Sequence, residues 1–163
     1  ASDLGRLTVL LERVDAQRLI ILGDFFHGPE SQDPLVHDVL HDWRQRHARV
    51  AMTLVRGNHD RRSGDPPASL RIDVVPSLSI DTLELLHEPT TLPGRHVVAG
   101  HVHPGVRLTD FDGSGVTVPC FVVDESLMIL PAFGRFTGLA RVDPAPRRRL
   151  FAVAARRVVE VRS

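Results

Sequence analysis

The sequence predicts an α/β protein, and two observations support this fold class. In the first half of the chain, short apolar runs typical of buried strands alternate with two amphipathic helices. In the second half, short β-rich runs follow one another with turn signals between them. This order favours either a mixed sheet or two sheets packed together, with helices outside. The 163 residues and 18.0 kDa fit a single domain over residues 1–163.

Two helices are predicted from apolar residues at helical spacing. The first covers residues 2–14, with Ser2 as its N-cap. Its apolar face consists of Leu4, Leu7, Leu10, Leu11 and Val14. The second covers residues 34–46, with Pro34 near its first position. Its inner stripe consists of Leu35, Val36, Val39, Leu40 and Trp43.

The predicted strands are short and rich in Val, Ile and Leu. In the first part of the chain they cover residues 18–22, 48–55, 70–75, 83–86 and 97–100. In the second part they cover residues 116–123, 127–130, 150–154 and 158–161. Polar and Gly- or Pro-containing segments between them, including residues 25–33, 61–68 and 90–94, are predicted loops.

Composition and charge indicate the cellular compartment of the protein rather than its activity. The formal net charge is +0, so no overall field indicates a nucleic-acid or membrane partner. The single Cys120 cannot form an internal disulfide, which favours a reducing compartment. No apolar run approaches the length of a membrane span. A cytoplasmic protein is therefore expected.

Metal-competent side chains follow four of the predicted strands: Asp24, Asn58, His87 and His101. Buried strands of α/β proteins present their binding groups at their carboxyl ends. His103 lies two positions after His101, and in an extended segment both side chains point the same way. Carboxylate and imidazole together suit Mn, Fe or Zn better than Ca. The sequence therefore predicts a shared site for one cation or for a close pair.

Such a site suits phosphoryl transfer. The Asp24 carboxylate is the candidate bridge, because each of its oxygens has its own lone pairs. Two cations roughly 3.5–4 Å apart can hold a hydroxide and a phosphoryl oxygen for in-line displacement. His59, next to Asn58, is the candidate to protonate the leaving oxygen.

Four motifs, in order, resemble those of the calcineurin-like metallophosphoesterases. They are Gly23-Asp24, Gly57-Asn58-His59-Asp60, His87 and Gly100-His101-Val102-His103. Further short segments resemble those of the bacterial ligase-associated DNA-repair phosphoesterases. They are residues 22–27, 87–89, 100–104, 119–121 and 130–138. The similarity extends from about residue 4 to residue 138.

The resemblance implies roles for the residues that match the motifs. Asp24 would bridge two ions, with Asn58, His87 and His101 completing one site and His103 in the other. His59 would be the catalytic histidine. The implied fold is a four-layer α/β/β/α sandwich of two mixed sheets flanked by helices. The implied cofactors are two divalent ions, Mn²⁺ first, with Fe or Zn as alternatives.

The implied activity is hydrolysis of phosphodiester bonds, with DNA in a repair pathway as the substrate. A DNA ligase and a helicase of the same repair system are the implied partners, in a bacterial cytoplasm. The alternatives are a phosphomonoesterase or nucleotide pyrophosphatase on the same scaffold, because substrate choice lies in surrounding loops. A non-catalytic binding module, similar to the scaffold subunit of the retromer coat, is a further alternative.

One motif of the family, an Asp-x-His on an early strand, is not in this sequence. Without it, the second metal site keeps only Asp24 and His103. Either the given sequence begins after these N-terminal strands, or the protein lacks them and holds one metal. The first is expected, because the chain opens inside a helix.

Further residues near the motifs are candidates for supporting roles. Asp60 is a catalytic candidate together with His59. It is expected to orient the loop or to form a hydrogen bond with an imidazole. His27 either reaches the site, where it would bind substrate, or is a solvated loop residue. A guanidinium can hold a phosphate in bidentate fashion, and the candidates for this are Arg56, Arg61, Arg62 and Arg135. The alternative is that these four arginines are ordinary surface residues, because the sequence contains no Lys and uses Arg as its surface cation.

Overall fold

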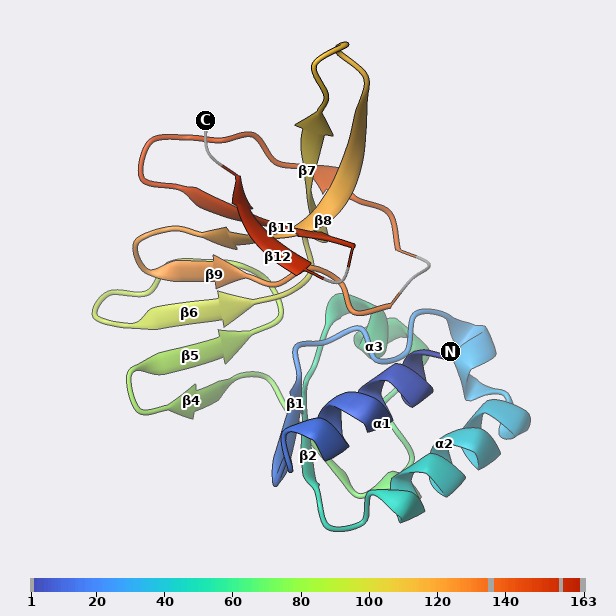
Figure 1. The fold of residues 1–163 in the computed structure, drawn as a ribbon. Coiled ribbons are helices and arrows are strands. Elements are labelled where there is room, and N and C mark those ends of the chain that lie inside the picture. The colour runs from blue at the N-terminus through green and yellow to red at the C-terminus, as the bar shows by residue number, and fades with distance from the viewer. Residues whose placement is uncertain (1, 135–136, 156, 162–163) are drawn as a thin grey trace. The chain divides into compact units, whose positions relative to one another are not determined.

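The computed structural model describes residues 2–134, 137–155 and 157–161, in a chain that divides into two compact units. Unit 1 is Ala1–Leu78, and unit 2 is Ser79–Ser163. The fold is mixed α/β with two sheets, as predicted (Figure 1). Within the described residues, every helix belongs to unit 1. None of the described helices combines the length and hydrophobicity needed to cross a bilayer.

The sheet of unit 1 has three parallel strands in the order β1-β2-β3. They are β1 (Arg18–Ile21), β2 (Ala51–Val55) and β3 (Ile72–Val75). The register places Leu19, Met52 and Ile72 side by side on one face. This sheet is parallel throughout, so the prediction of two mixed sheets holds only for the larger sheet of unit 2.

Two helices cover this face of the sheet. They are α1 (Asp3–Arg13) and α2 (Pro34–Arg46), and both follow the predicted ranges closely. The hydroxyl of Ser2 accepts a hydrogen bond from the N–H of Gly5 and so caps α1, as expected. Leu11 of α1 and Trp43 of α2 share one core cluster with Met52 of the sheet. A 3₁₀ turn, η1 (Pro29–Gln32), precedes α2, and a second, η2 (Ala68–Leu70), precedes β3.

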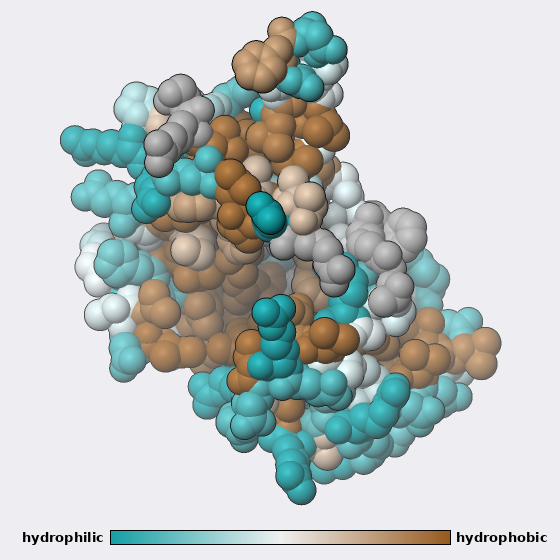
Figure 2. All heavy atoms as spheres, in the orientation of Figure 1, coloured by the Kyte–Doolittle hydropathy of each residue, from teal (hydrophilic) through white to brown (hydrophobic). Residues whose placement is uncertain are grey.

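The predicted inner stripe of α2 is only partly buried. Leu40 and Trp43 are buried, whereas Leu35 is 73% exposed and Val39 is 57% exposed. Figure 2 shows apolar surface on this part of the molecule. Together with Leu4, residues of this stripe line an open apolar groove. Helical periodicity identifies the apolar face of a helix, but the buried area depends on what packs against that face.

A short helix, α3 (Asn58–Ser63), replaces the start of the loop predicted over residues 61–68. Gly57 is its N-cap, and the Asp60 carboxylate at the third helical position accepts the N–H of Gly57. Gly64, with φ of 93°, ends the helix. Six residues are too few to show a helical period of apolar residues, so the sequence pattern did not reveal this helix.

Within the described residues, the sheet of unit 2 has nine strands. They are β4 (Leu78–Ile80), β5 (Leu83–Leu86), β6 (His96–Ala99), β7 (Pro104–Thr109), β8 (Gly115–Val123), β9 (Leu127–Ile129), β10 (Ala140–Arg141), β11 (Arg149–Ala154) and β12 (Arg157–Val161). Their order is β10-β7-β8-β9-β6-β5-β4, with β11 pairing with β8 and β12 with β11. Strands β4, β7 and β10 were not predicted.

The sheet of unit 2 is mixed, with parallel pairs at β5–β6–β9 and at β7–β10. Strand β6 pairs parallel with β5 and with β9. Strand β8 pairs antiparallel with β7 and with β11, and β11 pairs antiparallel with β12. The β7–β8 hairpin projects from the rest of unit 2 (Figure 1). The core of this unit is centred on Val106, Cys120 and Leu150. Cys120 is fully buried, and this burial raises the pKa of its thiol.

Candidate metal centre

Unit 1 places its candidate ligands after two neighbouring parallel strands. Asp24 follows β1 after Leu22 and Gly23, and Asn58 follows β2 after Arg56 and Gly57. Gly23 has φ of 88° and Asp24 has φ of 54°, both in the left-handed region. Glycine adopts this region freely, and Asp is among the few other residues that tolerate it. The turn after β1 is therefore suited to a Gly-Asp pair.

The Asp60 carboxylate joins the two loops. Its two oxygens accept hydrogen bonds from the backbone N–H groups of Asp24 at 2.7 Å, Phe26 at 3.0 Å and Gly57 at 2.8 Å. The Asp60 side chain is fully buried. Three such bonds satisfy a buried carboxylate, and they hold the loop after β1 against the start of α3.

His59 lies between these groups and a second histidine. Its backbone N–H donates to Asp24 Oδ1 at 3.0 Å. Its ring Nδ1 lies 3.1 Å from the carbonyl oxygen of His27. The two rings stack, with centroids 4.1 Å apart and planes 17° from parallel. The structure thus brings His27 against His59, across 32 positions of sequence, and no feature of the sequence pattern indicated this contact.

The candidate phosphate-binding arginines differ in their surroundings. Arg56 forms a bidentate pair with Asp65, with contacts of 2.8 and 2.5 Å. This hydrogen bonding and the Asp65 charge raise the pKa of Arg56. Arg61 and Arg62 are exposed in the last turn of α3. Arg135 lies outside the described residues.

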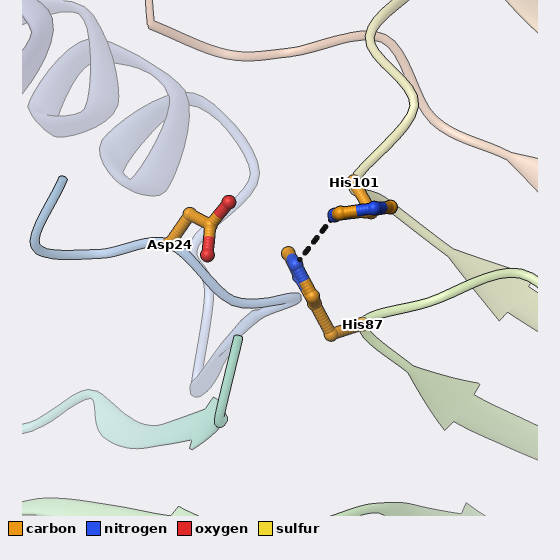
Figure 3. A group of neighbouring side chains, drawn as sticks. All are labelled: Asp24, His87 and His101. Carbon is orange, nitrogen blue, oxygen red and sulfur yellow. Dashed lines mark hydrogen bonds between the residues drawn. The ribbon is translucent and has the colours of Figure 1, made fainter. Parts of the chain in front are cut away.

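Unit 2 places two histidines after its own pair of parallel strands. His87 follows β5 and is buried, and His101 follows β6 across Gly100 and is exposed. The N–H of Gly100 donates to the carbonyl oxygen of His87 at 3.1 Å, which ties the two strand ends together. His101 Nδ1 lies 3.0 Å from His87 Nε2, and the rings meet edge to face at 70° (Figure 3).

The segment containing His101 and His103 is not extended. Both residues have positive φ, 67° and 52°, and the backbone turns at each of them before β7 begins. The argument that period two points both side chains the same way is therefore wrong for this segment. The carbonyl oxygen of His103 accepts the N–H of Ala140, which attaches the turn to β10.

The two histidine nitrogens, which are hydrogen-bonded to each other, have the separation expected of adjacent ligands of one cation. With metal–nitrogen bonds of about 2.1 Å, neighbouring octahedral ligand atoms lie about 3 Å apart. The two ring nitrogens of His87 and His101 have this separation. The donors labelled in Figure 3 are of two kinds, the carboxylate of Asp24 in unit 1 and the imidazoles of His87 and His101 in unit 2. This set of donors suits a divalent transition metal.

The crystal structure of Pseudomonas putida nuclease MPE is similar to this chain. The TM-score is 0.87 at 43% sequence identity, and the match covers 98% of this chain and 77% of the nuclease chain. The fold is thus that of a nuclease, a class of hydrolases that act on phosphodiester bonds. The chain belongs to the same family as the Pseudomonas putida nuclease. No protein-family model matches the chain, and no curated protein does.

Proposed function

We propose that this protein is a metal-dependent nuclease that hydrolyses phosphodiester bonds of DNA. The observation that carries the proposal is the 43% identity to a nuclease across 98% of the chain. Candidate ligands after parallel strand pairs in both units support it. A role in DNA repair in the bacterial cytoplasm, beside a DNA ligase and a helicase of the same system, follows from the resemblance of the motifs.

In this proposal, residues of both units hold two divalent ions, with Mn²⁺ first and Fe or Zn as alternatives. By the resemblance, Asp24 would serve both ions, Asn58, His87 and His101 would complete one site, and His103 would belong to the other. When bound, the ions supply a hydroxide nucleophile at neutral pH and offset the charge on the phosphoryl oxygens. The proposal is supported by the chemistry of the donor set and by the 3.0 Å separation of the His87 and His101 nitrogens.

The remaining residues act on the substrate directly or hold those that do. His59 acts as proton donor in its doubly protonated form: Nε2 gives its proton to the leaving oxygen, and Nδ1 keeps its own proton toward the His27 carbonyl oxygen. Asp60 keeps the loops of Asp24 and His59 in place through its three backbone bonds. Arg61 and Arg62 are exposed and contact the phosphate backbone. Arg56 joins them only by exchanging its Asp65 partner for a phosphate.

The test measures hydrolysis of single-stranded DNA, nicked duplex DNA and bis-p-nitrophenyl phosphate by the purified protein with Mn²⁺. We expect turnover that EDTA abolishes. Asp24→Asn keeps a residue that tolerates positive φ, and it should reduce the rate by about 1,000-fold because it weakens the cation site. Asp15→Asn is the matched control, because Asp15 also has positive φ, 48°, but is an exposed residue after α1.

Three outcomes would contradict the proposal. They are equal turnover by the Asp24→Asn and Asp15→Asn variants, faster hydrolysis of p-nitrophenyl phosphate than of the diesters, and less than one equivalent of Mn²⁺ after loading. The second outcome would favour a phosphomonoesterase on the same scaffold. The third would favour a binding module.

A further inference from the structure

The imidazole of His27 stacks on that of His59, and the proposed reaction leaves its role open. We infer that His27 is a positioning residue, which fixes the tautomer and the ring plane of His59. This inference rests on the proposed function, in which His59 is the proton donor. It differs from the expectation that His27 binds substrate.

The first step concerns the tautomer of His59. A backbone carbonyl oxygen only accepts hydrogen bonds, so the 3.1 Å contact to the His27 oxygen requires a proton on Nδ1. A neutral His59 ring then has its lone pair on Nε2. Proton exchange with a substrate oxygen therefore takes place at Nε2 alone.

The second step concerns the ring plane. A hydrogen bond at one edge still allows the imidazole to tilt about that bond. The His27 ring removes this freedom, because it stacks on His59 at 4.1 Å and only 17° from parallel. The backbone of His59 is held separately, through its N–H bond to Asp24 Oδ1. Backbone, edge and face of this residue are thus each in contact with a defined group.

The third step concerns His27 itself, which must be held to position anything. The residue before it, Phe26, is buried, and its N–H donates to Asp60 Oδ1 at 3.0 Å. The same carboxylate binds the N–H of Asp24 and that of Gly57. His27 therefore extends from a loop that is clamped to the start of the helix carrying His59.

Two variants distinguish the effect of the His27 aromatic ring from the effect of its nitrogen atoms. His27→Ala removes the stacked ring, whereas His27→Phe keeps an aromatic face and removes the nitrogens. His96→Ala, at an exposed position of β6, is the control for loss of an imidazole. We expect His27→Ala to lower kcat on a diester about tenfold with KM nearly unchanged, and His27→Phe to restore most of this loss.

A spectroscopic measurement tests the inference without turnover. Long-range ¹H–¹⁵N correlations of the histidine rings are recorded on the metal-free protein, with His59→Gln used to assign the signals of His59. We expect the Nδ1–H tautomer of His59 in the wild type and in His27→Phe. We expect a mixture of tautomers in His27→Ala, because without the stacked ring the imidazole can tilt away from the backbone carbonyl oxygen that every variant retains.

The inference is overturned if His27→Phe loses as much kcat as His27→Ala, since the nitrogens would then act on the substrate. It is also overturned if the His59 tautomer is the same in all variants. Absence of Mn²⁺-dependent turnover by the wild type would defeat the proposed function, whereas the tautomer measurement would still decide whether His27 positions His59.

Discussion

The two units present their candidate ligands by the same topology but hold them by different means. Unit 1 is a parallel sheet with helices, whereas unit 2 has a mixed sheet and, in its described residues, no helix. Yet in each unit the metal-competent residues follow two adjacent parallel strands, β1 and β2 or β5 and β6. Parallel neighbours end at the same edge of a sheet, which is why this arrangement recurs at binding sites.

The difference lies in what fixes the loops. In unit 1 a side chain does so, because the Asp60 carboxylate binds N–H groups of both loops. In unit 2 the backbone contributes directly, through the bond from Gly100 to His87 and through the positive φ of His101. Unit 1 is therefore the half whose loop geometry depends on one substitutable side chain.

The largest predicted effect tests whether the two units serve one centre. Asp24→Asn in unit 1 and His87→Gln in unit 2 should each weaken Mn²⁺ binding about 100-fold, because each removes a ligand. The double variant should lose much less than the product of the two losses, because both residues bind the same ion. Calorimetric titration with Mn²⁺ measures this coupling. Two separate binding steps, each weakened by only one of the two variants, would show that the two units bind metal independently.

The next effect concerns the clamp of unit 1. Asp60→Asn replaces one accepting oxygen with a donor that faces backbone N–H groups, so the unfolding free energy should fall by about 3 kcal/mol. Denaturant unfolding measures it. Asp73→Asn, an exposed position in β3, makes the same chemical change and should alter stability little. Equal losses of stability at the two positions would show that the Asp60 carboxylate does not hold the two loops together.

A smaller effect tests the backbone of unit 2. His101 has φ of 67°, so His101→Gly should be more stable than His101→Ala by about 1 kcal/mol. At His96, in the extended strand β6, the order should reverse, with the Gly variant less stable than the Ala variant. Thermal unfolding of the four metal-free variants gives the comparison. The same order at both positions would refute the backbone argument.

The smallest effect uses Cys120 as a reporter of unit 2. Burial raises the pKa of this thiol, so native protein at pH 8 should react with a disulfide reagent at least about tenfold more slowly than denatured protein. Because the folded state retains the thiol proton, this contribution to stability is full below the ordinary thiol pKa and declines as pH rises above it. Fast labelling of native protein would show that the core of unit 2 opens readily.

The sequence allowed the strand ends to be predicted, and with them the residues at those ends. β5 and α2 have the predicted bounds, because each is a clear apolar or amphipathic run. The helix α3 was missed, because it is held by one carboxylate and one glycine rather than by periodic apolar residues. The β7 strand was missed because it begins at Pro104, directly after the turn at His103.

The contacts between residues of the candidate centre could not be predicted from the sequence. Asp60 binds the loop of Asp24 across 36 positions, and His59 meets His27 across 32. Such pairings depend on which strands become neighbours, and no local pattern encodes them. The expectation that Asp60 orients the loop came from the chemistry of its neighbours, whereas its three backbone partners became visible only in the folded chain.

The shared carboxylate of unit 1 also has a kinetic consequence. The amide hydrogens of Asp24, Phe26 and Gly57 all point to Asp60, so none can be replaced by deuterium until that carboxylate releases it. Two stretches of chain that are far apart in sequence should therefore exchange their hydrogens in a single concerted opening, at one common rate.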